Sequence, residues 1–170
     1  GYDGSGAGVT VSLLSGTGSG GDAEGDTLAG IENLGGSDFN DFLIGSGAAN
    51  VLSGLGGDDL LKGGGGADSL NGGTAIDTAS YFDSGAGVSV SLATGNGFFG
   101  TAAGDTLTNI ENLTGSGQGD SLYGNTGANR LKGAGGADYL YGADGDDTLE
   151  GSAGGDTMDG WNGVDTLDYS

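Results

Sequence analysis

The sequence contains no cysteine, no histidine and no proline, and only three of its 170 residues are basic. Without cysteine or histidine, the chain offers neither disulfide bonds nor a zinc site built from those ligands. Without proline, its 44 glycines are not those of a collagen-like triple helix. Nucleophilic catalysis also lacks its usual base, because serine and threonine have no histidine to activate them. We therefore expect a protein that is not an enzyme.

The shortage of positive charge is equally informative, because 24 acidic residues give a net charge of -21. Binding to nucleic acid requires cationic groups that neutralise phosphates, so no nucleic-acid partner is expected. Acidity disfavours anionic membrane surfaces, and the sequence has no apolar run of membrane-spanning length, so no direct membrane insertion is expected. Acidic, glycine-rich chains with few aromatics usually stay disordered in water. Something must therefore offset the charge before this chain becomes compact.

What the sequence does contain is eleven nonapeptides that begin with glycine, in two blocks at 36–80 and 115–168. Clear examples are GLGGDDLLK (54–62) and GAGGADYLY (133–141). Position six always carries a carboxylate or a carboxamide: Asp41, Asn50, Asp59, Asp68, Asp77, Asp120, Asn129, Asp138, Asp147, Asp156 and Asp165. Position eight is always apolar: Leu43, Leu52, Leu61, Leu70, Ala79, Leu122, Leu131, Leu140, Leu149, Met158 and Leu167.

This pattern predicts an all-β solenoid. The first six residues of a nonapeptide are rich in glycine and small polar residues, which is typical of a tight turn. The last three alternate polar, apolar and polar, which predicts a short strand with one inward side chain. Two strands and two turns make one coil of 18 residues. Stacked coils then form parallel sheets, with position eight filling the interior.

Position-six residues 18 apart should lie one coil apart on the same edge, and rows of carboxylates require cations. Calcium takes six to eight oxygen ligands and accepts both carboxylates and backbone carbonyls, whereas magnesium demands stricter octahedral geometry. We expect about seven or more calcium ions in the turns, held by the eleven position-six residues. The expected pairs are Asp41–Asp59, Asp59–Asp77, Asn50–Asp68, Asp120–Asp138, Asp138–Asp156, Asn129–Asp147 and Asp147–Asp165.

A longer duplication contains the nonapeptides. GAGVTVSL (6–13) matches GAGVSVSL (85–92), and GDTLAGIENL (25–34) matches GDTLTNIENL (104–113). We expect one continuous solenoid, because repeats of this kind cover each other's open ends. The predicted division is unit 1 at 1–80, with an insert at 2–35 and nonapeptides at 36–80, and unit 2 at 81–170, with an insert at 81–114, nonapeptides at 115–168 and the start of a further insert at 169–170.

The inserts themselves show two patterns. The alternation of Val9 with Val11, and of Val88 with Val90, predicts a strand in each insert. A second apolar set is expected to continue the coil, namely Leu28, Ile31 and Leu34 with Leu107, Ile110 and Leu113. Asp26 and Asp105 are left open as further ligands, since their spacing is not nine.

The nonapeptides resemble the Gly-Gly-x-Gly-x-Asp-x-apolar-x repeats of the RTX, or haemolysin-type, calcium-binding family. GAGGADYLY (133–141) and GADGDDTLE (142–150) fit this pattern well, whereas GSGAANVLS (45–53) and GGTAIDTAS (72–80) depart from it. The resemblance implies a parallel β-roll, which is a right-handed β-solenoid, with calcium-driven folding. It also implies export through a type I secretion channel, and hence a secreted, extracellular or cell-surface location.

Two functions are compatible with this resemblance. The first is a calcium-binding structural module of a secreted or cell-surface bacterial protein, such as an adhesin, a matrix fibre or a surface layer. The alternative is a C-terminal folding and secretion module of a type I-secreted enzyme or toxin whose catalytic domain is not in this chain. The two long units favour the first. Homo-assembly, end to end or lateral, stays open, as does a carbohydrate or surface partner at outward aromatics such as Tyr139 and Trp161.

Overall fold

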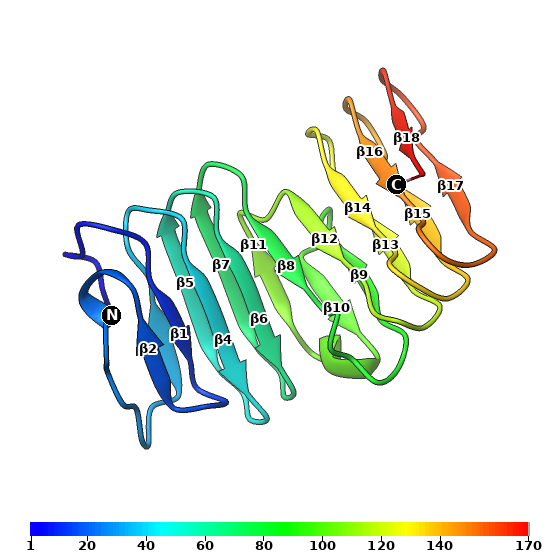
Figure 1. Ribbon diagram of the computed structural model, residues 1–170. Helices are drawn as coiled ribbons and strands as arrows, with labels where there is room; N and C mark the ends of the chain where they lie inside the picture. Colours follow the sequence, from blue (N-terminus) through cyan, green and yellow to red (C-terminus); the bar gives the residue numbers. More distant parts are fainter. Residues whose placement is uncertain (170) are drawn as a thin grey trace.

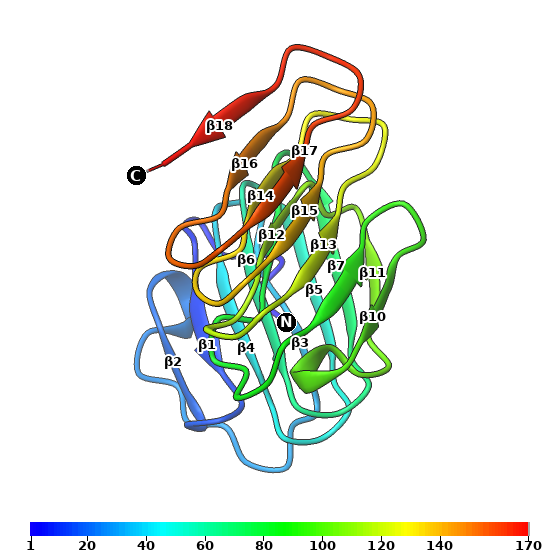
Figure 2. The ribbon, with the colours of Figure 1, turned by 90° about the vertical axis from the view of Figure 1, so that its right-hand side faces the viewer.

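The computed structural model describes residues 1–169 and shows an all-β solenoid of about eight turns, with about 18 residues per turn. Its strands form two nine-stranded sheets. Figure 1 shows the coils stacked from the N-terminal end, in blue, to the C-terminal end, in red, and Figure 2 faces the C-terminal end of the stack. The predicted fold class, a parallel β-solenoid of stacked coils, is confirmed.

The two sheets are called A and B. In spatial order, sheet A contains β18 (Thr166–Asp168), β16 (Thr148–Glu150), β14 (Arg130–Lys132), β12 (Asn112–Thr114), β8 (Thr78–Ser80), β6 (Leu60–Gly64), β4 (Phe42–Ser46), β1 (Thr10–Ser12) and β2 (Thr17–Ser19). Sheet B contains β17 (Thr157–Asp159), β15 (Tyr139–Tyr141), β13 (Ser121–Tyr123), β9 (Ser89–Ser91), β10 (Asn96–Phe98), β11 (Thr106–Thr108), β7 (Ser69–Thr74), β5 (Val51–Gly56) and β3 (Asn33–Gly35).

Two 3-10 helices, η1 (Gly21–Ala23) and η2 (Gly100–Ala102), lie in the inserts. Over the described residues, no helix has the length and apolar character needed to cross a bilayer.

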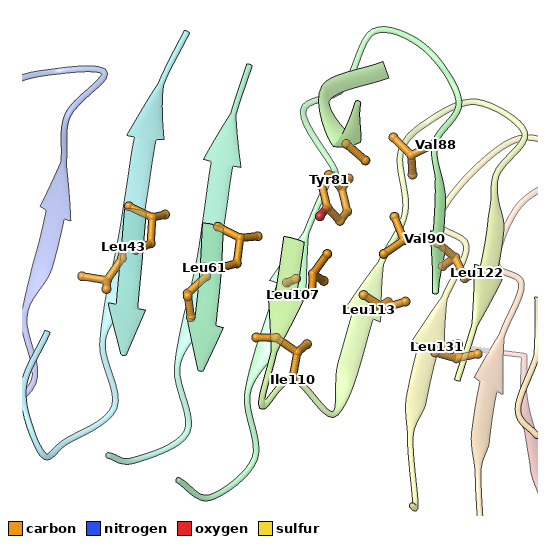
Figure 3. Close-up of a cluster of buried hydrophobic side chains, with 14 of the residues drawn as sticks. Leu43, Leu61, Tyr81, Val88, Val90, Leu107, Ile110, Leu113, Leu122 and Leu131 are labelled. Atoms are coloured by element: carbon orange, nitrogen blue, oxygen red, sulfur yellow. The ribbon is translucent and has the colours of Figure 1, made fainter. Parts of the chain in front are cut away.

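Within each block, the strands of the nonapeptides stack in register, because strands 18 residues apart pair in parallel. Leu43 lies opposite Leu61, and Leu122 lies opposite Leu140. All position-eight side chains from Leu43 to Leu149 are fully buried. Successive side chains of a strand point to opposite faces, so one residue in each three-residue strand points inward. Figure 3 shows four of these side chains, Leu43, Leu61, Leu122 and Leu131, with the buried side chains of the second insert in one hydrophobic cluster.

The last coil departs from this prediction. Met158 is only partly buried, and 47% of the surface of Leu167 is exposed. Their strands, β17 and β18, are the terminal strands of their sheets within residues 1–169, so no further coil covers them. Position eight therefore fills the interior only where another coil stacks on both sides.

The second insert takes a path that the periodicity did not reveal. From β8, in sheet A, the chain crosses to sheet B. There it forms β9, turns back through β10 and turns again into β11. Strand β11 pairs in parallel with β7, and β9 pairs in parallel with β13. The antiparallel strand β10 is thus inserted between two parallel stacks, and the second block of nonapeptides continues on the far side of it.

The first insert follows the same path at the N-terminal end. Strand β1 forms an antiparallel hairpin with β2 and pairs in parallel with β4. The predicted strands around Val11 and Val90 are confirmed, and so is the continuation of the coil at Leu34, Leu107 and Leu113. The segment around Leu28 differs, because it forms only one isolated bridge, from Thr27 to Thr17.

Both sheets run without a break across the boundary between residues 80 and 81. The division into two units stays a prediction about sequence organisation. Of the predicted further insert at 169–170, Tyr169 is exposed and Ser170 lies outside the described residues.

All three basic side chains form ion pairs. Lys62 contacts Asp83 at 2.7 Å, while Arg130 and Lys132 both bind Glu150, Arg130 at 2.6 Å. The Glu150 carboxylate is almost fully buried. Burial alone would raise its pKa, but hydrogen bonds from Lys132, Ser152 and Arg130 outweigh that effect and lower it. The basic residues therefore neutralise local carboxylates and leave the position-six rows unpaired with cations.

Candidate metal centre

The position-six side chains form continuous hydrogen-bonded rows along the solenoid. One side-chain oxygen, Oδ1, accepts the backbone N–H of the position-six residue one coil earlier. Asp59 Oδ1, for example, lies 2.8 Å from the nitrogen of Asp41. The structure joins all seven predicted pairs in this way, at 2.8–3.1 Å: Asp41–Asp59, Asp59–Asp77, Asn50–Asp68, Asp120–Asp138, Asp138–Asp156, Asn129–Asp147 and Asp147–Asp165.

The eleven nonapeptides divide into two kinds by the conformation of their turns. Seven repeats have a left-handed backbone, with positive φ, at positions two and four; we call them open repeats. They are 54–62, 63–71, 72–80, 133–141, 142–150, 151–159 and 160–168. This backbone explains the glycine at position four of most of these repeats, because glycine adopts positive φ without strain. The four remaining repeats, 36–44, 45–53, 115–123 and 124–132, are called closed repeats.

In a closed repeat, the position-two residue binds the position-six side chain of the same repeat. The N–H of Ser37 donates to Asp41 Oδ2 at 2.5 Å, and the N–H of Ser116 donates to Asp120 Oδ2 at 2.5 Å. Both serine hydroxyls donate to the same carboxylates. The carboxylates of Asp41 and Asp120 therefore have a full set of protein donors and are poorly placed to receive a cation.

Asn50 and Asn129 are the carboxamides of the other two closed repeats. The amide nitrogen of Asn50 donates to the carbonyl of Glu32 at 2.7 Å, and that of Asn129 donates to the carbonyl of Glu111 at 2.8 Å. Their Oδ1 atoms accept N–H groups as well. A carboxylate could not make the bond to a carbonyl, so asparagine suits these positions, where a block meets its insert.

In the open repeats, the second carboxylate oxygen has no such partner. The Oδ2 atoms of five residues are buried and, within the described part of the chain, accept no hydrogen bond: Asp59, Asp68, Asp77, Asp138 and Asp147. A buried polar atom without a partner costs about 1–3 kcal/mol, and more if it is charged. These five oxygens thus indicate a ligand that protein atoms do not supply.

The first glycine of a repeat lies against the position-six side chain of the same repeat. A Cβ atom on Gly54 would lie 1.8 Å from Asp59 Oδ2 and 2.5 Å from the carbonyl oxygen of Gly72 in the next coil. On Gly142, it would lie 2.3 Å from Asp147 Oδ2 and 3.0 Å from the carbonyl oxygen of Gly160. A carboxylate and a carbonyl therefore converge above each of these glycines, where only a residue without a side chain fits.

This donor set fits a hard cation. The ligands are carboxylate and carbonyl oxygens, which calcium prefers, and no nitrogen or sulfur ligand is present. No group of three or more acidic side chains among residues 1–169 is placed so that it could hold a metal ion by itself. Backbone carbonyls and water must therefore complete the six to eight ligands that calcium takes. The residues present fit a calcium ion whose remaining ligands are backbone carbonyls and water.

Two acidic residues of the second insert continue the rows of position-six side chains. Asp105 Oδ1 accepts the N–H of Asp68 at 2.8 Å, and Glu111 Oε2 accepts the N–H of Asp77 at 2.9 Å. Both rows therefore continue through the insert, although Asp105 was only an open alternative and Glu111 was not predicted. A sequence signal existed, because Asp105-Thr106-Leu107 has the same form as Asp147-Thr148-Leu149 of a nonapeptide.

Burial changes the acidity of the row. Burial raises the pKa of Asp59 to about 7; the hydrogen bond from the Asp41 N–H opposes this, and the charges of Asp77, Asp41 and Asp58 add to it. Burial likewise raises the pKa values of Asp77, Asp105 and Asp138 to about 6. Removing these carboxylates from water without a cation therefore disfavours their charged form.

The raised pKa values predict an unusual pH dependence for the metal-free chain. The unfolded aspartate pKa is about 3.9, so the folded state binds more protons between about pH 4 and 7. The stability from these protons is complete below pH 4 and is lost as the pH rises to about 7. We expect more β-structure by circular dichroism at acidic than at neutral pH in calcium-free buffer. The same comparison is made in about 1 M salt, which screens the general repulsion between the carboxylates. If the difference in β-structure between acidic and neutral pH vanished in that salt, or had the opposite sign, the prediction would be contradicted.

The turns also predict a stabilising substitution. Ala75 is exposed and has a φ of 88°, at a position where most open repeats have glycine. A non-glycine residue in this conformation costs about 1–2 kcal/mol, so we expect Ala75→Gly to raise the free energy of unfolding by about 1 kcal/mol. Ala103, which is exposed with a φ of −66°, is the matched control, and Ala103→Gly should lower it by about 0.5–1 kcal/mol. Urea unfolding in calcium measures the free energy of unfolding of both variants. If that free energy changed in the same direction in both, the explanation by backbone conformation would be refuted.

The outward aromatic residues pack on one another across strands. The ring of Tyr123 lies 5.8 Å from that of Tyr139, and the ring of Tyr141 lies 6.1 Å from that of Trp161. Aromatic pairs of this geometry stabilise neighbouring strands. Sheet stabilisation accounts for their presence, and a carbohydrate partner stays untested.

Comparison with known proteins agrees with this geometry. The family model described as the RTX calcium-binding nonapeptide repeat (4 copies) matches residues 26–61, 35–70, 44–79, 114–149 and 141–170, which together span more than half of the chain. A search of curated proteins returned no match. RTX repeats bind calcium, occur typically in secreted bacterial proteins and form a structural rather than a catalytic family. The chain therefore belongs to the RTX calcium-binding nonapeptide-repeat family.

Proposed function

We propose that this chain is a calcium-dependent structural module of a secreted or cell-surface bacterial protein, which folds and stiffens when calcium binds between successive coils. The observation that carries the proposal is the set of five buried Oδ2 atoms without partners. Each belongs to an open repeat, and at Gly54, Gly72 and Gly142 a backbone carbonyl approaches the same point as the carboxylate. A cation at these points would remove the cost of burying unpaired charge.

The proposed ligands are the position-six carboxylates of the seven open repeats: Asp59, Asp68, Asp77, Asp138, Asp147, Asp156 and Asp165. The closed repeats, whose position-six side chains bind the protein itself, take a structural part in the rows. Seven divalent ions would offset two thirds of the net charge of -21. The module has no catalytic activity of its own, since these carboxylates are committed to the rows and the chain lacks histidine and cysteine.

Calcium binding would be coupled directly to folding. A ligand that binds only the folded state stabilises it by about 2.7 kcal/mol per site at 100 times its dissociation constant. Several such sites suffice to reverse the stability of a highly charged chain. An array of this type would be unfolded where calcium is scarce and ordered outside the cell, where calcium is plentiful.

The test is a calcium titration followed by circular dichroism, with chelator added at the end and magnesium as the matched control. We expect calcium to convert a disordered spectrum into a β-spectrum, chelator to reverse it and magnesium to have little effect. Asp59→Asn should lower the calcium stoichiometry, while Asp3→Asn, at an exposed residue outside the rows, should not. A β-spectrum that chelator leaves unchanged at neutral pH would refute the proposal.

A further inference from the structure

A groove made of three adjoining hollows lies beside the ends of strands β9, β13 and β15 of sheet B. The largest hollow has a volume of about 610 Å³, and the other two have volumes of about 420 and 370 Å³. All three share Ala93, the second residue after β9. Strands β13, β15 and β17 lie side by side here (Figure 2). The lining residues of the groove all lie between Ser89 and Trp161, so neither end of the sequence forms part of it.

The largest hollow combines aromatic rings with polar side chains. Its lining includes Tyr141 and Trp161, whose ring centroids are 6.1 Å apart. It also includes the polar residues Asn125, Thr126 and Asp144. The ring contact that stabilises the sheet also holds the two aromatic side chains in place at the wall of the groove, which is the kind of preorganisation that a binding site requires.

The polar side chains of this hollow have hydrogen-bonding capacity that the protein does not use. The Oδ1 atom of Asn125 accepts the N–H of Gly127, and the Oδ1 atom of Asp144 accepts the side-chain amide of Asn162. Within residues 1–169, three further groups form no hydrogen bond, namely the Nδ2 amide of Asn125, the hydroxyl of Thr126 and the Oδ2 atom of Asp144. The hollow therefore offers a ligand both donors and acceptors, beside two aromatic rings.

The first unit provides an internal comparison, because the duplication gives each of these positions a counterpart. Ala93, Asn125, Thr126, Tyr141 and Asp144 correspond to Leu14, Ser46, Gly47, Lys62 and Gly65. The hollow that these counterparts line has a volume of only about 250 Å³. Lys62 is also engaged there, since its ammonium group pairs with Asp83 at 2.7 Å. The second unit thus has more room and more polar side chains than the first at the same place in the fold.

We propose that this groove binds an uncharged oligosaccharide. The negative face of an aromatic ring attracts the C–H groups on the apolar face of a pyranose ring. Sugar hydroxyls both donate and accept, so they can use the amide of Asn125 as well as the carboxylate of Asp144. Asp144 and the net charge of -21 disfavour an anionic ligand. A cation would offer no acceptor to the amide of Asn125. Three adjoining hollows suit a chain of sugar rings better than a single ring.

This inference goes beyond the proposed function, and each can fail without the other. Circular dichroism reports whether calcium folds the chain, whereas sugar binding is measured on the protein that calcium has already folded. A chain that folds with calcium but binds no sugar would overturn the inference alone.

The experiment uses Trp161, the single tryptophan of the chain, as a reporter in the wall of the groove. Its fluorescence is followed in calcium while methyl glycosides of glucose, galactose, mannose and N-acetylglucosamine are added to about 50 mM, which reveals dissociation constants in the millimolar range. We expect a saturable change with at least one sugar, and tighter binding of the corresponding tetrasaccharide. No change with any sugar, or a change with tetramethylammonium chloride alone, would overturn the proposal.

Two substitutions bring first-unit residues into the groove and leave Trp161 in place. Ala93→Leu would fill the point where the three hollows meet and should weaken sugar binding by about tenfold or more. Asn125→Ser would remove one donor and should weaken it by about threefold to tenfold. The first unit accommodates these residues as Leu14 and Ser46, so we expect both variants to fold, and circular dichroism in calcium checks this.

Leu14→Ala, the reverse change in the first unit, is the matched control and should bind sugar as the wild type does. If Ala93→Leu also bound sugar with wild-type affinity, the groove would not be the binding site.

Discussion

Gly54→Ala is expected to lower the free energy of unfolding in calcium by about 2–3 kcal/mol, near the upper part of the range for overpacked sites, and to weaken calcium binding. The new Cβ atom would lie 1.8 Å from Asp59 Oδ2 and 2.5 Å from the carbonyl oxygen of Gly72. The carbonyl belongs to the backbone of the next coil and cannot rotate away. The methyl group would therefore displace the very oxygens between which the cation is proposed to lie.

Gly47→Ala is the matched control for this substitution. Gly47 lies in the neighbouring repeat, and an added Cβ atom would meet nothing within 4 Å. Its φ is not positive, so alanine should stabilise the chain by about 0.5 kcal/mol through the unfolded state. Calcium titrations and urea unfolding of both variants provide the comparison. If Gly54→Ala bound calcium as the wild type does, the proposed position of the ion would be wrong.

Leu61→Ala is expected to lower the free energy of unfolding by about 2–5 kcal/mol, the range for buried leucines. Leu61 is fully buried at position eight of β6, between Leu43 and Ala79 of the adjacent strands. The interior is only one side chain deep per strand, so no second layer is available to fill the cavity. Urea unfolding at saturating calcium measures the loss, because it holds the metal contribution constant.

Ile76→Ala is the control for the loss of aliphatic carbon. Ile76 is 58% exposed in a turn, so its truncation should change the stability by no more than about 0.5 kcal/mol. An equal loss in the two variants would mean that the packed interior does not limit stability. A small loss in both would assign nearly all stability to the metal ions.

The sequence period predicted the coil because side-chain alternation and turn chemistry act locally. Leu43, Leu61 and Leu131 lie where a coil of 18 residues places them, and the seven position-six pairs are in contact. Glycine at position four of most open repeats is explained by the left-handed backbone there, which is also a local property. Short-range information is therefore sufficient for the repeats.

The inserts required information that the period does not contain. The antiparallel excursion through β10 depends on pairing between β7 and β11, whose partners Ser69 and Thr106 are 37 residues apart. The distinction between open and closed repeats was also missed. In the closed repeats, Ser37, Ser46, Ser116 and Asn125 at position two bind the position-six side chain. Ser152 occupies the same position of an open repeat, so the residue type at position two does not separate the two kinds.

The two inserts send their hairpins to opposite sides of the molecule, since β1–β2 belongs to sheet A and β9–β10 to sheet B. Successive nonapeptides alternate sheets, so the parity of a block decides this outcome. Five repeats separate the two inserts, and an odd count turns the next hairpin through half a revolution. An even count, such as the six repeats of the second block, would keep the next one on the same side. Gain or loss of a single nonapeptide would thus move every later surface feature to the other flank while leaving each coil intact.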